Sequence, residues 1–157
     1  MKLLTELIVA IFATISFSAL FGVPRRFYPL CGIIGCVGWE VYCFLLNPCG
    51  ATIASFIATA VVIFLSRMAA IRQHCPVTIF LISGIFPLVP GTGVYWTSYY
   101  LVTNQLDLAV QHGYQAVKIA FAIVLGIVLI FELPQGLFMF LLGRRPLQIK
   151  SESDHQN

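Results

Sequence analysis

The sequence predicts an all-α polytopic membrane protein with about five transmembrane helices. Of its 157 residues, 59% are hydrophobic and only 10% are charged, and the mean hydropathy is +0.93. A soluble domain carries about 25% charged residues, so this chain has too few to cover a surface that faces water. Its apolar residues fall into five runs, and a helix needs about 20 such residues to cross the hydrocarbon core of a bilayer.

The five runs follow one another closely. They cover residues 3–22, 28–46, 51–70, 76–102 and 114–142. The gap between the second and third runs consists of Asn47, Pro48, Cys49 and Gly50, and this turn composition predicts an antiparallel helical hairpin. Small residues recur four positions apart in both runs, which lets helices approach closely in lipid. We expect one transmembrane domain at residues 1–145 and a polar cytoplasmic tail at residues 146–157.

Basic residues predict the orientation of the chain. We assign them to the first loop, to the third loop and to the segment after the fifth run, whereas the second and fourth loops contain none: Arg25, Arg26, Arg67, Arg72, Arg144, Arg145 and Lys150. Positive residues favour the cytoplasmic side, so the N-terminus is expected outside and the C-terminus inside. The first run has a rival interpretation as a cleaved signal peptide. We favour a retained span because the run is long for a signal peptide.

The fourth run is broken at its centre. Residues 84–93 read GIFPLVPGTG, and no straight helix accommodates two prolines and three glycines in ten residues. Irregular backbone at membrane depth survives only where protein or a water-filled cavity covers it, and transporters use such breaks to aim helix N-termini at anionic substrates. The candidate substrate-binding residues are Pro90, Gly91, Thr92, Gly93 and Tyr95, with Thr92 as the expected helix cap. The alternative is a kink that only packs against its neighbours.

Two acids lie inside the runs, Glu40 in the second and Glu132 in the fifth. An ionisable group at this depth is costly and is a functional candidate by default. Proton coupling and an intramembrane charge are the two roles considered, and a structural ion pair or a snorkelling side chain is the alternative. Pro134 is expected to kink the fifth run. Lys118 either pairs with a carboxylate substrate or snorkels outward, and we favour snorkelling.

Motifs of catalysis and of metal binding are missing from the sequence. There is no Walker A motif, no H-E-x-x-H and no G-x-S-x-G, and the three histidines are expected in loops or in the tail. The five cysteines form no C-x-x-C pair, so we interpret them as small packing residues rather than redox or metal sites. The sequence therefore predicts no enzyme, no cofactor, no metal site and no nucleic-acid partner.

Two segments carry a family resemblance. VPRR at residues 23–26 and PLVPGTGVY at residues 87–95 resemble the threonine/serine exporter family, and the likeness extends over about residues 3–145. It is a likeness to the short C-terminal module of that family, as a separate small subunit. The resemblance implies export of small carboxylates across the bacterial inner membrane, with a C4 dicarboxylate such as succinate as the expected substrate and a larger, YjjP-like membrane subunit as partner.

Three alternatives stay open at this point. The substrate could be threonine or serine instead of a dicarboxylate. The chain could also be a scaffold subunit that transports nothing, in which the broken helix only docks the partner. The third alternative is a small channel, which predicts passive flow that does not depend on the proton gradient.

The predicted orientation can be tested with a reporter fused to the C-terminus. A reporter that is active only in the cytoplasm should be active, because the positive loops place this end inside. A reporter that is active only outside the cytoplasm should give no signal, and a signal from it would contradict the orientation.

Overall fold

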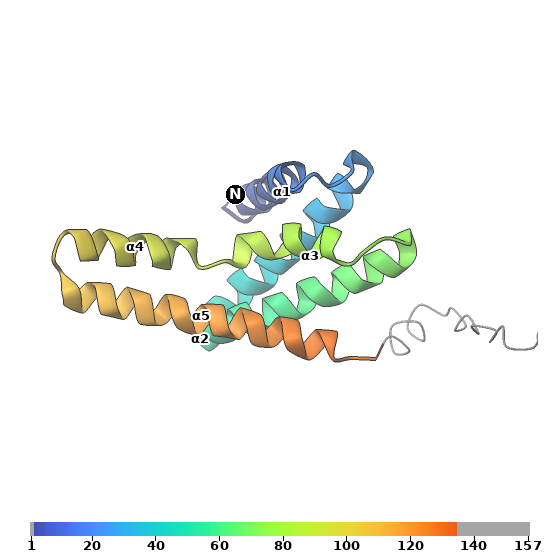
Figure 1. Cartoon of the computed structure of the whole chain (residues 1–157). Coiled ribbons are helices and arrows are strands. Elements are labelled where there is room, and N and C mark those ends of the chain that lie inside the picture. Colours follow the sequence, from blue (N-terminus) through green and yellow to red (C-terminus); the bar gives the residue numbers. More distant parts are fainter. Residues whose placement is uncertain (1, 135–157) are drawn as a thin grey trace, which may run out of the picture.

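The computed structural model of the chain describes residues 2–134. In this part every regular element is a helix, which confirms the predicted all-α class (Figure 1). In chain order the elements are α1 (Lys2–Leu20), the 3₁₀ turn η1 (Arg25–Phe27), α2 (Tyr28–Gln73), α3 (Thr78–Ile85), the 3₁₀ turn η2 (Phe86–Leu88), α4 (Gly91–Val102) and α5 (Leu106–Phe131).

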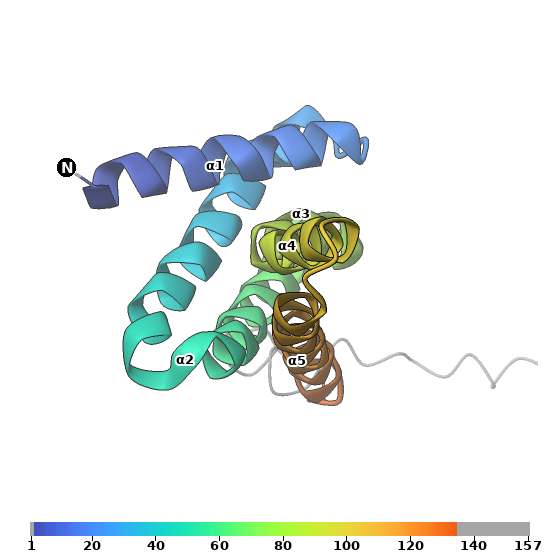
Figure 2. The same cartoon turned by 90° about the vertical axis from the view of Figure 1, so that its left-hand side faces the viewer.

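Helix α2 consists of two limbs that meet at Gly50. This glycine has φ 78° and ψ 163°, a backbone conformation open almost only to glycine. Figure 2 shows the chain descending through the first limb (residues 28–49), turning at the bottom and returning through the second limb (residues 51–73). The predicted hairpin is therefore confirmed, although its second limb extends to Gln73. At 1.5 Å per residue, each limb is about 33 Å long, enough to cross a bilayer.

The number of spans is only partly settled by helix length and apolarity. Within residues 2–134, two continuous helical stretches are long and apolar enough to cross a membrane, Arg25–Gln73 and Leu106–Phe131. The first of these contains the Gly50 turn. A third candidate span exists if Thr78–Leu88 and Gly91–Val102, which are bent by 48° relative to each other, together form one span. The apolar part of α1, Thr5–Leu20, is shorter. The count of five and the orientation remain predictions.

Small residues sit wherever two helices cross closely. A methyl group added at Gly35 in the first limb would overlap Thr14 of α1, and one added at Gly38 would overlap Val62 of the second limb. One added at Gly126 of α5 would lie 3.2 Å from the Cβ atom of Thr59. Of the eight small residues that were predicted to bring the limbs together, Ala51 is only half-buried. The other seven are buried: Cys31, Gly32, Gly35, Cys36, Ala54, Ser55 and Ala58.

The fourth predicted span is broken as expected, and its second half pairs with α5. Helix α3 continues into the 3₁₀ turn η2, which ends at Leu88. After an extended Val89, α4 begins at Gly91. In Figure 1, α4 and the first half of α5 run side by side and project away from the other helices. They pack through two small residues, because a methyl group added at Gly93 would lie 3.0 Å from the Cβ atom of Ala116 and one at Gly113 would lie 3.3 Å from Thr97.

Helix α5 differs from the predicted fifth span at both ends. It begins at Leu106, eight residues earlier than expected, so the polar residues up to His112 are helical rather than part of a loop. Asp107 in the first turn favours this start because it faces the positive end of the helix dipole. The helix ends at Phe131, before Pro134, and the rest of the predicted span, residues 135–142, lies outside the described part together with the tail.

Arg67 closes the end of α5, and its predicted place in a loop was wrong. It lies inside the second limb and is 7% exposed. Its Nη1 atom donates to the carbonyl of Ile130 at 2.6 Å and to that of Leu133 at 2.9 Å. In a continuous helix the Ile130 carbonyl would accept from the N–H of residue 134, but Pro134 has none. The guanidinium therefore replaces a donor that proline removes, at the negative end of the helix dipole.

The crossing at Gly35 predicts a cost for even one added methyl group. Gly35→Ala should lower the free energy of unfolding in detergent by about 1–3 kcal/mol, because the new Cβ atom would overlap Thr14. Gly91→Ala is the matched control, since nothing lies within 4 Å of its added Cβ atom. Equal thermal unfolding of the two variants would contradict the packing described here.

The contact of Arg67 with α5 predicts a second stability effect. Arg67→Met keeps the length of the side chain but leaves one buried and one partly buried carbonyl without their charged donor, so unfolding should become easier by about 1.5–3 kcal/mol. Arg72→Met, at an exposed position one turn later, should change little. Denaturant titration of both variants makes the comparison, and an equal loss in both would refute a capping role.

Candidate functional site

A cavity of about 490 Å³ lies at the break between α3 and α4. Its walls come from both limbs of α2, from the break itself and from the first half of α5. The lining residues are Trp39, Tyr42, Ser55, Pro87, Leu88, Val89, Pro90, Gly91, Thr92, Gly93, Trp96, His112, Gln115, Ala116 and Ile119. Four of the five predicted substrate-binding residues, Pro90 to Gly93, therefore lie together on one wall, and we call this space the break cavity.

The N-terminus of α4 opens into the break cavity without a side-chain cap. The cap position is occupied by Pro90 and not by Thr92, which was the predicted cap and is the second residue of the helix. Pro90 has no N–H, and the N–H of Gly91 donates to the Val89 carbonyl at 2.7 Å. The first N–H groups of a helix have no partner within it, and Thr92 and Gly93, the second and third residues of α4, line the cavity. Such donors, with the positive end of the helix dipole, suit an anion.

The two glycines of the motif have different roles. Gly93 is a packing residue, because a side chain there would press on Ala116 of α5. Gly91 has no such constraint, since its φ is not positive and an added Cβ atom would meet nothing within 4 Å. Its small size therefore serves neither a turn nor a helix crossing. It leaves the backbone accessible to whatever enters the cavity.

Most hydroxyl groups after the motif are already used by the helix backbone. Thr97 donates to the Gly93 carbonyl at 2.7 Å, and Ser98 donates to the Val94 carbonyl at 3.0 Å. Tyr95, the fifth predicted residue, does not line the cavity; it is 61% exposed and packs edge-on against Trp96. The Thr92 hydroxyl is thus the one hydroxyl of the predicted set that lies on the cavity wall.

Aromatic rings form the other walls, and sequence reasoning placed only Trp96 among them near the site. Trp39 and Tyr42 come from the first limb, and their ring centroids are 5.5 Å apart. On the opposite side Trp96 stacks on Tyr100, which stacks on His112 with centroids 5.3 Å apart. His112 was expected in a loop, but it lies in α5. The sequence alone offered no signal that would place these residues, from segments far apart, around one space.

The charged residues lie outside the break cavity. No lysine, arginine, aspartate or glutamate is among its described lining residues. Lys118 lies with its Nζ atom 4.9 Å from the centre of the Tyr114 ring, one turn toward the start of α5. An anion held in this cavity therefore depends on backbone donors, on neutral side-chain donors such as Thr92 and Gln115, on His112 and on what other chains contribute.

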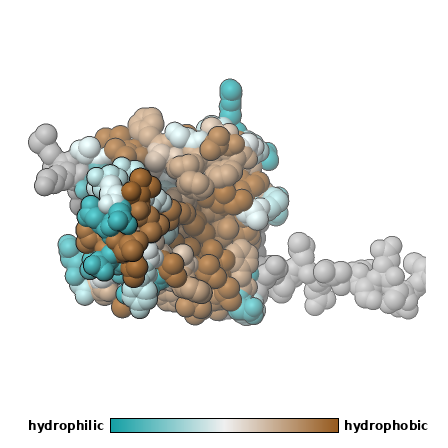
Figure 3. All heavy atoms as spheres, turned by 60° about the vertical axis from the view of Figure 1, so that its left-hand side comes forward, coloured by the Kyte–Doolittle hydropathy of each residue, from teal (hydrophilic) through white to brown (hydrophobic). Residues whose placement is uncertain are grey.

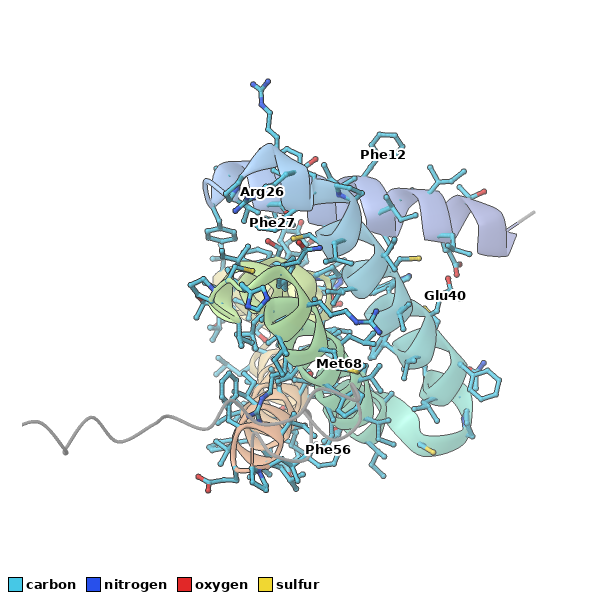
Figure 4. All side chains as sticks on the ribbon, turned by 90° about the vertical axis from the view of Figure 1, so that its right-hand side faces the viewer. Phe12, Arg26, Phe27, Glu40, Phe56 and Met68 are labelled. Carbon is cyan, nitrogen blue, oxygen red and sulfur yellow. The ribbon has the colours of Figure 1, made fainter. Side chains whose placement is uncertain are left out.

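The two candidate acids have different surroundings. Glu132 follows the last residue of α5 and is exposed. Glu40 lies on the first limb, on the side facing the N-terminal half of α1 (Figure 4). Its Oε1 atom is buried and has no hydrogen-bond partner in the described structure. Because the limb extends beyond the predicted end of the second span, Glu40 is about 15 Å from the Gly50 turn, deeper than expected.

The cysteines have the character of packing residues. All five are free thiols, and Cys31 and Cys36 are buried in the first limb. In the loop after α2, burial raises the pKa of the Cys75 thiol above its ordinary value, an effect that nearby Arg26 partly offsets. A raised pKa disfavours the reactive thiolate. Among the described residues, no group of three or more His, Cys, Asp or Glu side chains could hold a metal ion.

The outer surface is apolar over most of its extent. Figure 3 shows hydrophobic residues across most of one face, whereas hydrophilic residues gather at the tip where α4 turns into α5. Exposed large side chains of this kind include Phe12, Phe44, Val102, Phe121 and Leu125. A soluble monomer rarely shows such continuous apolar surface, and lipid covers it in a membrane protein.

Comparison with known proteins adds one match. Residues 6–132 match the family described as Threonine/Serine exporter, ThrE, which covers every helix named above except the first turn of α1. Neither a search of curated proteins nor a search of solved structures found a match. The match includes both segments on which the resemblance rested and the whole of the break cavity. The chain belongs to the threonine/serine exporter family.

Proposed function

We propose that the chain is the small subunit of an exporter for small carboxylates, and that the carboxylate binds in the break cavity at the N-terminus of α4. The family is one of membrane exporters, which supports transport rather than catalysis. The observation that carries the proposal is that Gly91, which no turn or helix crossing requires, lies in the wall of the cavity beside the free donors. A larger, YjjP-like membrane subunit would complete the transporter in the bacterial inner membrane.

The chemistry of the break cavity bears on the substrate. The N-terminus of α4 can hold one carboxylate through backbone N–H groups. Threonine and serine carry one carboxylate and one ammonium group, and the faces of Trp39, Tyr42 and Trp96 favour a cation. We therefore rank an amino acid first for this cavity, which reverses the order expected from the resemblance.

A C4 dicarboxylate such as succinate is the second candidate. It carries two carboxylates and needs a second positive partner, and the break cavity has no lysine or arginine in its described lining. Among the described lining residues, His112 in its protonated form would be the one such group. The remaining charge would have to come from the larger subunit. Succinate export therefore depends on the partner more strongly than amino-acid export does.

Deletion strains identify the solute. Export of succinate, threonine and serine is followed in cells lacking the gene, the gene of the predicted partner, or both. We expect one of the three solutes to fall equally in all three strains, because half of a two-subunit exporter is inactive alone. Unchanged export of all three solutes would refute the proposal.

Two matched variants separate a substrate site from a scaffold. Thr92→Val removes the hydroxyl that lines the break cavity, and the exported solute should bind about tenfold more weakly. Tyr95→Phe removes a hydroxyl outside the cavity and should leave export unchanged. Both proteins are first shown to reach the membrane and to assemble at normal levels. Equal, unchanged export by both variants would favour the scaffold.

A further inference from the structure

Basic side chains gather at one end of the helix bundle. The two limbs of α2 are antiparallel, so the link between α1 and α2 and the loop between α2 and α3 lie at the same end (Figure 1). Arg25 and Arg26 belong to η1 in this link, and Arg72 lies in the last turn of α2. All three side chains are exposed. We call these three arginines the basic end.

Hydrophobic contacts hold the link and the loop against each other. Phe27 of the link shares one buried cluster with Ala69 and Ala70 near the end of α2, and Cys75 of the loop packs against that cluster. Arg26 lies near the same loop, because its positive charge partly offsets the effect of burial on the pKa of Cys75. The fold therefore brings basic residues from two distant segments to one place.

The guanidinium group of Arg26 is held in a defined position. Its Cζ atom lies over the ring of Phe27, 4.5 Å from the ring centre (Figure 4). Phe27 is 3% exposed and packs edge-on against Phe80, with ring centroids 5.4 Å apart. A guanidinium that lies on an aromatic face keeps the N–H groups at its edge available to a partner. Arg26 is thus fixed on one side and has its donors to offer on the other.

The charge of the basic end is not neutralised within residues 2–134. None of its arginines forms an ion pair or donates a hydrogen bond in this part of the chain. Glu6 lies in the far half of α1, and Glu40 is about 18 Å along the first limb from its start. From residue 41 to residue 106 the sequence contains no acid. Like charges at one end of the bundle repel one another, and a bound anion relieves this repulsion.

Apolar surface adjoins the basic end. Leu20 and Phe21, which directly precede the link, are 75% and 45% exposed. Large exposed side chains of this kind are covered by lipid in a membrane protein. A ligand bound here therefore meets guanidinium donors and an apolar surface together. The phosphate and the acyl chains of a phospholipid fit both, whereas a soluble anion fits only the first.

We propose that the basic end binds the headgroup of an anionic phospholipid, with Arg26 as the main ligand of its phosphate. The planar fork of a guanidinium matches two phosphate oxygens, and further basic residues near the membrane surface add attraction. Arg25 and Arg72 have this second role, and the acyl chains lie along Leu20 and Phe21. The bound lipid would tie the end of α1 to the end of α2. The proposal does not depend on what the break cavity binds.

Lipid binding to the purified full-length chain tests this proposal. Native mass spectrometry compares phosphatidylglycerol with phosphatidylcholine that carries the same acyl chains, so that only the headgroups differ. The unmodified chain should bind the anionic lipid about tenfold more tightly. Arg26→Gln should lose most of this preference. Arg26→Lys should keep part of it, because lysine retains the charge but not the planar fork.

Two further variants serve as control and as reserve. Lys118→Gln removes one positive charge from α5, away from the basic end, and should bind both lipids as the unmodified chain does. Arg72→Gln changes an exposed residue and takes the place of Arg26→Gln if that variant does not fold. It should weaken binding of phosphatidylglycerol and leave binding of phosphatidylcholine unchanged.

Several outcomes would overturn the proposal. Equal binding of the two lipids by the unmodified chain is one, and an equal loss in the arginine variants and in Lys118→Gln is another, since it would show only general attraction to a positive protein. Displacement of phosphatidylglycerol by an excess of inorganic phosphate would mean a site for a soluble anion. No preference between the lipids, together with loss of the larger subunit from purified Arg26→Gln, would assign the basic end to an acidic surface of that subunit.

Discussion

Backbone polar groups in this chain need partners inside the protein, because the hydrocarbon of a membrane offers none. Each place where a helix stops meets this requirement differently. After α2, a left-handed His74 lets the N–H of Cys75 donate to the carbonyl of Ala70. At the end of α5, Arg67 supplies the donors. At the start of α4 no side chain caps the helix, and its first three residues line a cavity. The unfilled requirement at this third place is what makes it a candidate binding site.

Close helix contacts position that site. The first limb carries Trp39 and Tyr42, and it is held against α1 and the second limb by contacts that tolerate no side chain at Gly35 or Gly38. The opposite wall is held by the contact of Gly93 with α5. Burial contributes less to helix association in lipid than in water, and tight packing of small residues contributes correspondingly more. The cavity is therefore what remains where large aromatic residues and a backbone break interrupt this packing.

Local features of the fold were predictable from the sequence, and contacts between distant segments were not. The turn at Gly50 and the break before Gly91 follow from proline and glycine, whose backbone preferences are local. The buried Arg67 was misassigned because an arginine near the end of an apolar run looks the same whether it faces water or caps another helix. His112 was placed in a loop because polar residues at an exposed helix tip resemble a turn. The aromatic walls depend on tertiary packing, which no local pattern encodes.

Helix α4 has its main contact with α5 and no buried residue of its own, and a turn of only three residues joins the two. Mechanically, the pair is a cantilever that is anchored in the bundle by the second half of α5. Its other attachment is the segment at Val89 and Pro90, where an extended Val89 interrupts the helix between η2 and α4. Any swing of this arm must bend the chain there, in the wall of the break cavity. A change in the angle of the α4–α5 pair would therefore also change the volume that the break cavity offers to a ligand.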